Sequence, residues 1–168
     1  MTNESVPGDL DKDADKLGDD EGDDAFSGND ALDLARENLQ ALIIATVAYL
    51  DRAGLSVDDW IEGTGAIFAK NWTPSLFTST DHVWDGLLLT YQSLGAEVLE
   101  AARDDKPPTM TLSGFPDPYL CELFDVKAEV VARYNNSIRR IAGEIGYELC
   151  WRYEGGLTHL TLTSHDVG

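Results

Sequence analysis

Apolar residues recur at helical spacing in three segments of the first two thirds of the chain. The first segment begins near Asp30 and ends at Gly54, where a glycine is typical just past a helix. The second begins at Ser56, whose side chain can accept a hydrogen bond from the amide three residues on. The third opens near Ser79, and its apolar positions continue to Ala102. The pattern predicts a helical N-terminal half of about three helices.

Two glycines, Gly63 and Gly65, lie in the middle of the second predicted helix. A glycine inside a helix destabilises it by about 1 kcal/mol relative to alanine. Such residues are retained where another backbone approaches the helix closely. We therefore expect the second helix to pack tightly against a neighbouring element.

The C-terminal half changes to a mixed pattern. Residues 109–113 alternate as a short strand does, and a further helix with an apolar stripe follows from Asp125 to Gly146. Two alternating runs, 148–153 and 157–163, then flank Gly155-Gly156, a pair suited to a two-residue hairpin turn. Closing that turn predicts the register, with Arg152 opposite His159, Trp151 opposite Leu160 and Leu149 opposite Leu162.

A two-stranded hairpin is not stable alone, so residues 109–113 should add a third strand and helices should cover the apolar face. The sequence therefore predicts an α+β fold: a helical N-terminal half, then a long helix and a small antiparallel sheet ending in a C-terminal β-hairpin. Residues 29–168 form one globular domain in this interpretation. Residues 1–28 contain ten acids, two lysines and few large apolar side chains, which predicts an acidic disordered tail.

Acidic residues dominate the whole chain, with 31 Asp and Glu against 12 Lys and Arg and a formal net charge of -19. Nucleic-acid binding needs clustered basic side chains, so that class of function is not expected. The excess of Asp over Lys fits either a protein adapted to a high-salt host or an ordinary acidic protein with a charged tail. No apolar run reaches the length of a membrane span, and two cysteines make no disulfide framework. We expect a cytoplasmic protein that does not enter the membrane.

Aromatic residues are the first candidate site. Trp60, Phe68, Trp72, Trp84 and Tyr91 fall on adjacent predicted helices, where such side chains ordinarily belong to the core. They could also line a pocket for a small apolar ligand, which makes these five residues the predicted ligand-binding set.

Polar clusters are weaker candidates. Asp81, His82 and Asp85 lie within one helical turn and could ligate a divalent metal, although a dedicated site needs three or four converging ligands. A capped, solvated start of a helix explains the same residues. Among soft ligands, Cys121 and His165 join no motif with metal-ligand spacing.

The polar face of the predicted hairpin carries Cys150, Arg152 and His159. A cysteine with a histidine base could act as a nucleophile, although diagonal cross-strand neighbours usually lie too far apart. A charged pair on an exposed sheet face explains the pattern equally well. No cofactor is indicated by any motif.

Three classes of function therefore stay open. The first is a small ligand-binding or regulatory module with an aromatic-lined pocket, which the surplus aromatics favour. The second is an interaction or accessory protein that uses the hairpin edge or the acidic tail to hold a protein partner. The third is an enzyme with a polar site around Cys150, Arg152 and His159.

Overall fold

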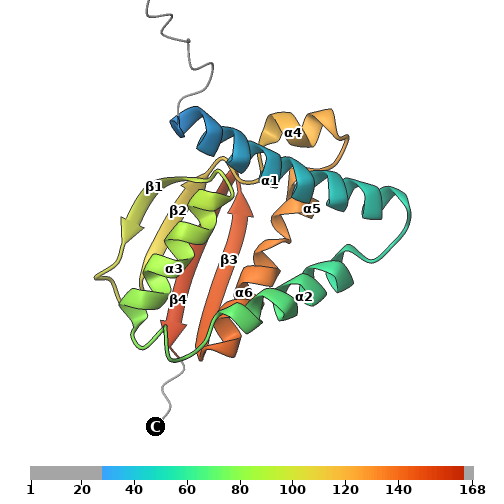
Figure 1. The fold of residues 1–168 in the computed structure, drawn as a ribbon. Helices are drawn as coiled ribbons and strands as arrows, with labels where there is room; N and C mark the ends of the chain where they lie inside the picture. The colour runs from blue at the N-terminus through green and yellow to red at the C-terminus, as the bar shows by residue number, and fades with distance from the viewer. Residues whose placement is uncertain (1–27, 165–168) are drawn as a thin grey trace, which may run out of the picture.

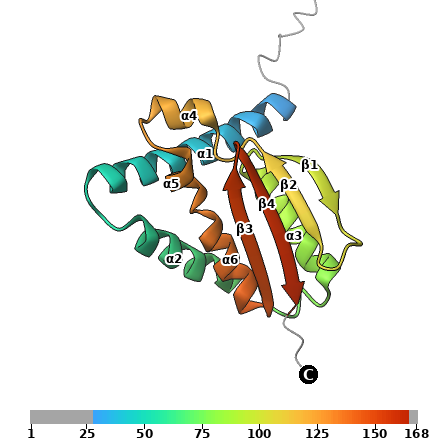
Figure 2. The ribbon, with the colours of Figure 1, turned by 180° about the vertical axis from the view of Figure 1, so that it is seen from behind.

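The computed structural model describes residues 28–164, and the predicted fold class is confirmed: helices pack against a four-stranded antiparallel sheet that ends in a C-terminal hairpin. Figure 1 shows α1, α2, α3 and α6 on the near side of the sheet, and Figure 2 shows the strands from behind without helices over them. The predicted tail, apart from Gly28, lies outside the described residues, and so does His165.

The N-terminal half is helical, as predicted. Its elements are α1 (Gly28–Arg52), α2 (Val57–Phe68), the 3-10 turn η1 (Ala69–Asn71) and α3 (Thr80–Ser93). The predicted cap at Ser56 is confirmed, because Ser56 Oγ accepts from the Asp59 amide at 3.1 Å. Ser79 caps α3 in the same way, with its Oγ accepting from the His82 amide at 3.3 Å. These caps satisfy amides that have no partner within the first helical turn. No described helix is both long and apolar enough to cross a membrane.

The sheet contains β1 (Glu97–Ala102), β2 (Thr109–Ser113), β3 (Tyr147–Glu154) and β4 (Leu157–Ser164), in the spatial order β1-β2-β4-β3. The predicted hairpin register is confirmed, including Arg152 opposite His159 and Leu149 opposite Leu162. The third predicted strand is also present, since β2 pairs with β4. Alternate residues point to opposite faces of a strand, so this register directs Leu149 and Leu162 to the core.

The fourth strand was not predicted from the sequence. The apolar positions of residues 98–102 continue the helical pattern of α3, but the helix ends at Ser93 and residues 97–102 form β1. Gly95 has a φ of +80°, a left-handed conformation that ends the helix and turns the chain. Val98 then lies opposite Leu112 of β2, so pairing with a distant strand decides the conformation.

The chain between the two hairpins is divided into short helices: α4 (Pro118–Leu123), α5 (Ala128–Ala132) and α6 (Asn135–Glu144). Asp125, where one long helix was expected to begin, instead has a φ of +53° and lies in the turn after α4. The amides of Arg133, Tyr134 and Asn136 bond to carbonyls three residues back, a tighter turn that joins α5 to α6.

The core lies between the helices and the apolar face of the sheet. Leu112, Leu149 and Leu162 from the strands are at most 1% exposed, and Leu87 and Ile138 from α3 and α6 are equally well covered at 1% and 2%. This packing places α3 and α6 on the same side of the sheet, and the candidate site lies between them.

Candidate apolar binding groove

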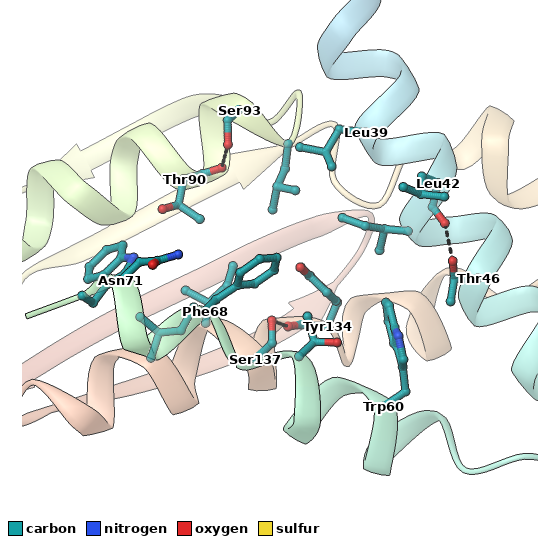
Figure 3. A pocket seen from close by; sticks show the side chains of 16 residues that line it. Leu39, Leu42, Thr46, Trp60, Phe68, Asn71, Thr90, Ser93, Tyr134 and Ser137 are labelled. Atoms are coloured by element: carbon teal, nitrogen blue, oxygen red, sulfur yellow. Dashed lines mark hydrogen bonds between the residues drawn. The ribbon is translucent and has the colours of Figure 1, made fainter. Parts of the chain in front are cut away.

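A groove with a cavity volume of about 420 Å³ lies among α1, α2, η1, α3 and α6 (Figure 3). Sixteen residues line it, and they fall into three kinds. The aliphatic residues are Leu39, Leu42, Ile43, Leu94, Ile138 and Ile141; the aromatic ones are Trp60, Phe68, Trp72 and Tyr134; the rest are Thr46, Thr64, Asn71, Thr90, Ser93 and Ser137. The volume falls within the range of about 300–1,000 Å³ that ligand pockets occupy.

The floor of the groove belongs to the core, whereas its rim is open to solvent. Ile138 and Tyr134 are 2% and 6% exposed. At the rim, Leu42 of α1 is 65% exposed and Phe68 of α2 is 45% exposed. The groove therefore presents apolar side chains to water on a surface that is otherwise rich in carboxylates.

The hydroxyl groups in the lining are largely bonded to their own helices. Thr46 donates to the Leu42 carbonyl at 2.7 Å, Thr90 to the Gly86 carbonyl at 2.8 Å, and Ser137 to the Tyr134 carbonyl at 2.8 Å. A helical hydroxyl that donates to its own backbone has its proton engaged and keeps only acceptor capacity. These residues thus contribute to an essentially apolar wall.

Two glycines allow the surrounding elements to approach closely enough to form the groove. A Cβ atom on Gly65 would lie 2.8 Å from the Ser137 carbonyl oxygen, so α2 packs directly on the α6 backbone. On α3, a Cβ on Gly86 would lie 2.8 Å from the Phe77 ring and 2.9 Å from the Trp72 ring. Those two rings are stacked, with centroids 4.3 Å apart and planes 6° apart, and Trp72 lines the groove.

Among residues 28–164, no Asp, Glu, Lys, Arg or His side chain lines the groove, although Asp, Glu, Lys and Arg make up 26% of the chain. Among the described residues of the lining, Tyr134 has a shifted pKa, because burial raises the pKa of its phenol. The phenol therefore stays protonated at neutral pH. The groove is electrically neutral inside a strongly acidic protein.

Three of the five aromatic residues predicted to form a pocket line this groove: Trp60, Phe68 and Trp72. The other two are core residues, since Trp84 is 4% exposed and Tyr91 is fully buried, and neither lines the groove. The Tyr91 hydroxyl donates to Asn135 Oδ1 at 2.6 Å, and burial raises the pKa of this phenol. Sequence reasoning missed the contributions of α1 and α6, for which the broad apolar face of residues 32–50 was the available signal.

Two of the three residues predicted as possible metal ligands, Asp81 and Asp85, form ion pairs with Arg103 instead. Arg103 lies 3.1 Å from Asp81 Oδ1 and 2.6 Å from Asp85 Oδ1, while His82 Nδ1 lies 3.1 Å from the Thr78 hydroxyl. Arg103 also donates to the Asp81 carbonyl at 3.0 Å. Among residues 28–164, no group of three or more His, Cys, Asp or Glu side chains could hold a metal ion.

Cys150, Arg152 and His159 lie on the open face of the sheet, away from the groove. Cys150 is opposite Thr161, whereas His159 is opposite Arg152 and its Nδ1 lies 3.3 Å from the Thr111 hydroxyl. Cys150 and His159 therefore do not lie directly opposite each other across the hairpin. Cys121 is separate from them and buried, and burial, with smaller effects of Asp117 and Glu129, raises the pKa of its thiol to about 11.

The chain matches no known family model, and neither a curated protein nor a solved structure is significantly similar to it.

Proposed function

We propose that this protein is a binding module whose groove takes an uncharged, apolar ligand. The observation that carries the proposal is the composition of the lining. Of the sixteen described residues that line the groove, ten are aliphatic or aromatic, and none carries a carboxylate, amine, guanidinium or imidazole. A neutral recess of this size is the expected form of a binding site for an apolar molecule.

The charge of the whole protein adds to this selectivity. At a formal net charge of -19, the protein repels anions, and the groove offers no basic group to offset that repulsion. A cation entering the groove loses hydration without gaining a counter-ion there. An uncharged apolar molecule meets neither penalty and removes apolar surface from water, which contributes about 25 cal/mol per Å².

The alternative site around Cys150, Arg152 and His159 has no comparable support. All three side chains project from an open sheet face, and Arg152 lies 3.9 Å from Glu154 in an exposed ion pair. Nothing in their arrangement favours an enzyme over a binding module.

A neutral fluorescent probe, N-phenyl-1-naphthylamine, tests the proposal because its emission rises in apolar surroundings. Phe68→Asp places a carboxylate at the rim of the groove and should weaken probe binding roughly tenfold, since a charge then needs hydration where the probe sits. Ile67→Asp is the matched control: Ile67 is the adjacent residue of α2, is 64% exposed and does not line the groove. Its dissociation constant should stay within about twofold of the wild-type value.

Equal weakening by the two variants would place the probe elsewhere on the surface. Absence of saturable probe binding to the wild-type chain would contradict the proposal outright.

A further inference from the structure

The apolar surface of α1 extends well beyond the groove. Leu32, Leu39, Leu42 and Tyr49 are separated by seven, three and seven residues, a spacing that places them on one face of a helix. Their exposed fractions are 51%, 40%, 65% and 62%. Leu39 and Leu42 line the groove, so the stripe runs past it in both directions. At 1.5 Å per residue the stripe is about 25 Å long.

A small molecule in the groove cannot cover this stripe. Its outer members, Leu32 and Tyr49, lie seven residues, or about 10 Å along the helix, beyond Leu39 and Leu42. Large apolar side chains exposed along one helix face over this length indicate an interaction surface for a macromolecule. The occupant must therefore be elongated and must bury both the groove and the flanking stripe.

The walls of the groove have the form of a helix-binding site. Thr90 and Ser93 of α3 lie on one side, Ser137 of α6 lies on another, and α1 runs past them (Figure 3). An amphipathic helix can lie along such a groove with its apolar face inward, because its backbone bonds are satisfied internally and need no partner on the groove wall. An extended strand would need hydrogen-bond partners for its own backbone N–H and C=O groups, and the side chains that form these walls do not supply them.

The charge of the elements around the groove favours a positively charged partner. The five elements that form the groove, α1, α2, η1, α3 and α6, together carry ten acidic residues and five lysines and arginines, a net charge of -5 around a neutral recess. A second copy of the chain brings another -19, and residues 1–28 carry ten acids against two lysines, so both are repelled. A helix with basic residues beside its apolar stripe is attracted instead.

We infer that the groove and the Leu32–Tyr49 stripe dock an amphipathic helix of a partner protein, with an apolar face against the groove and basic residues on either side of that face. This inference rests on the proposed function, because the part of the partner helix that enters the groove is its uncharged apolar face. The helix is about five turns long, the length of the stripe.

The test uses the full chain and a labelled synthetic helix of about 18 residues that carries leucines at helical spacing and lysines elsewhere. Fluorescence anisotropy should show saturable one-to-one binding. Leu42→Asp should weaken it roughly tenfold. Leu99→Asp is the matched control, because Leu99 is 52% exposed on β1, far from the groove, and should leave affinity within about twofold. A peptide of the same composition with scrambled order, and one with glutamate in place of lysine, should both bind at least about tenfold more weakly.

Equal binding of the scrambled peptide would overturn the inference, since it shows attraction by charge alone. Equal effects of Leu42→Asp and Leu99→Asp would overturn it as well. Binding of the neutral naphthylamine probe without binding of the leucine-lysine helix leaves the proposed function intact and overturns this inference. Failure of both ligands overturns both.

Two other possible occupants of this surface would give different experimental results. Self-association that Leu42→Asp abolishes, seen by sedimentation, would assign the surface to a second copy and contradict a partner helix. Tighter peptide binding after Leu17→Asp or Phe26→Asp would assign it to the N-terminal segment of the same chain, with the same consequence.

Discussion

At the scale of single residues, Gly65 sets the distance between α2 and α6. A Cβ there would lie 2.8 Å from the carbonyl oxygen and 2.9 Å from the Cα of Ser137, and a backbone cannot yield as a flexible side chain does. Gly63, one half-turn away on the same helix, has no atom within 4 Å of its hypothetical Cβ. The sequence indicated close packing at both glycines, and the structure shows it at Gly65 only.

This contrast predicts effects of opposite sign. Gly65→Ala should lower the free energy of unfolding by about 1–3 kcal/mol because the helices must move apart. Gly63→Ala should raise it by up to about 1 kcal/mol, since alanine favours the helix and meets no neighbour. Urea unfolding of the two variants measures both changes. A loss of stability in Gly63→Ala as large as that in Gly65→Ala contradicts the packing described here.

The Cys121 thiol gives stability a dependence on alkaline pH. Burial raises its pKa from 9.0 to about 11, so the folded chain holds a proton that the unfolded chain releases. The contribution of the protonated thiol to the free energy of unfolding is fully present below pH 9.0. It should be lost as the pH rises toward 11, which lowers the free energy of unfolding by up to about 2–3 kcal/mol. The raised pKa of the buried Tyr91 and Tyr134 phenols adds to this loss above pH 10.0.

The measurement is the free energy of unfolding across this range for the wild-type chain and Cys121→Ala. The variant should lack the decline that begins near pH 9.0 and keep the one due to the tyrosines. Identical pH profiles would rule out Cys121 as the source.

At the scale of elements, the C-terminal hairpin was predictable in full because its signals are local. The two-glycine turn and the alternation of the flanking runs together fix the register. β1 was not predictable, because its residues follow the helical pattern of α3 and become a strand through Gly95 and pairing with β2. Local spacing misleads where a distant partner decides the conformation.

The turn itself gives a test of the hairpin. Gly155 and Gly156 have φ values of +61° and +81°, as a type I′ turn requires. Gly155→Asn should be nearly neutral, because Asn-Gly is the favoured pair in this turn. Gly156→Val should destabilise by about 1–2 kcal/mol, because a β-branched residue is strained at this φ. Thermal unfolding distinguishes the two, and equal stability of both variants would contradict the turn type.

At the scale of the whole molecule, the charge that surrounds the groove also acts on stability. Several acids are neutralised by arginines distant in sequence, such as Asp58 by Arg133 and Asp85 by Arg103, but 31 acids face only 12 basic residues. Self-repulsion of the remainder opposes compaction, and salt screens it.

The unfolding temperature should therefore rise by about 3 °C or more, equivalent to about 1 kcal/mol, as KCl shortens the Debye length from about 10 Å to about 3 Å. Sucrose is the control, because it favours the compact state by exclusion without screening charge. An equal gain in sucrose would show that screening is not the cause.

The groove itself was only partly predictable. Aromatic surplus on adjacent helices pointed to Trp60, Phe68 and Trp72, but the same signal included Trp84 and Tyr91, which the fold buries. The spacing of a residue along one helix does not state which neighbouring helix it will face. The walls supplied by α1, α3 and α6 follow from tertiary packing that no local pattern encodes.

The central claim is that a neutral groove in a strongly acidic protein selects uncharged apolar ligands. The most direct measurement compares N-phenyl-1-naphthylamine with 8-anilino-1-naphthalenesulfonate, which shares its ring skeleton and adds a sulfonate. At low salt the neutral compound should bind the full chain at least about tenfold more tightly, because the lining has no cation to receive the sulfonate. Equal affinity, or tighter binding of the sulfonate, would contradict the claim.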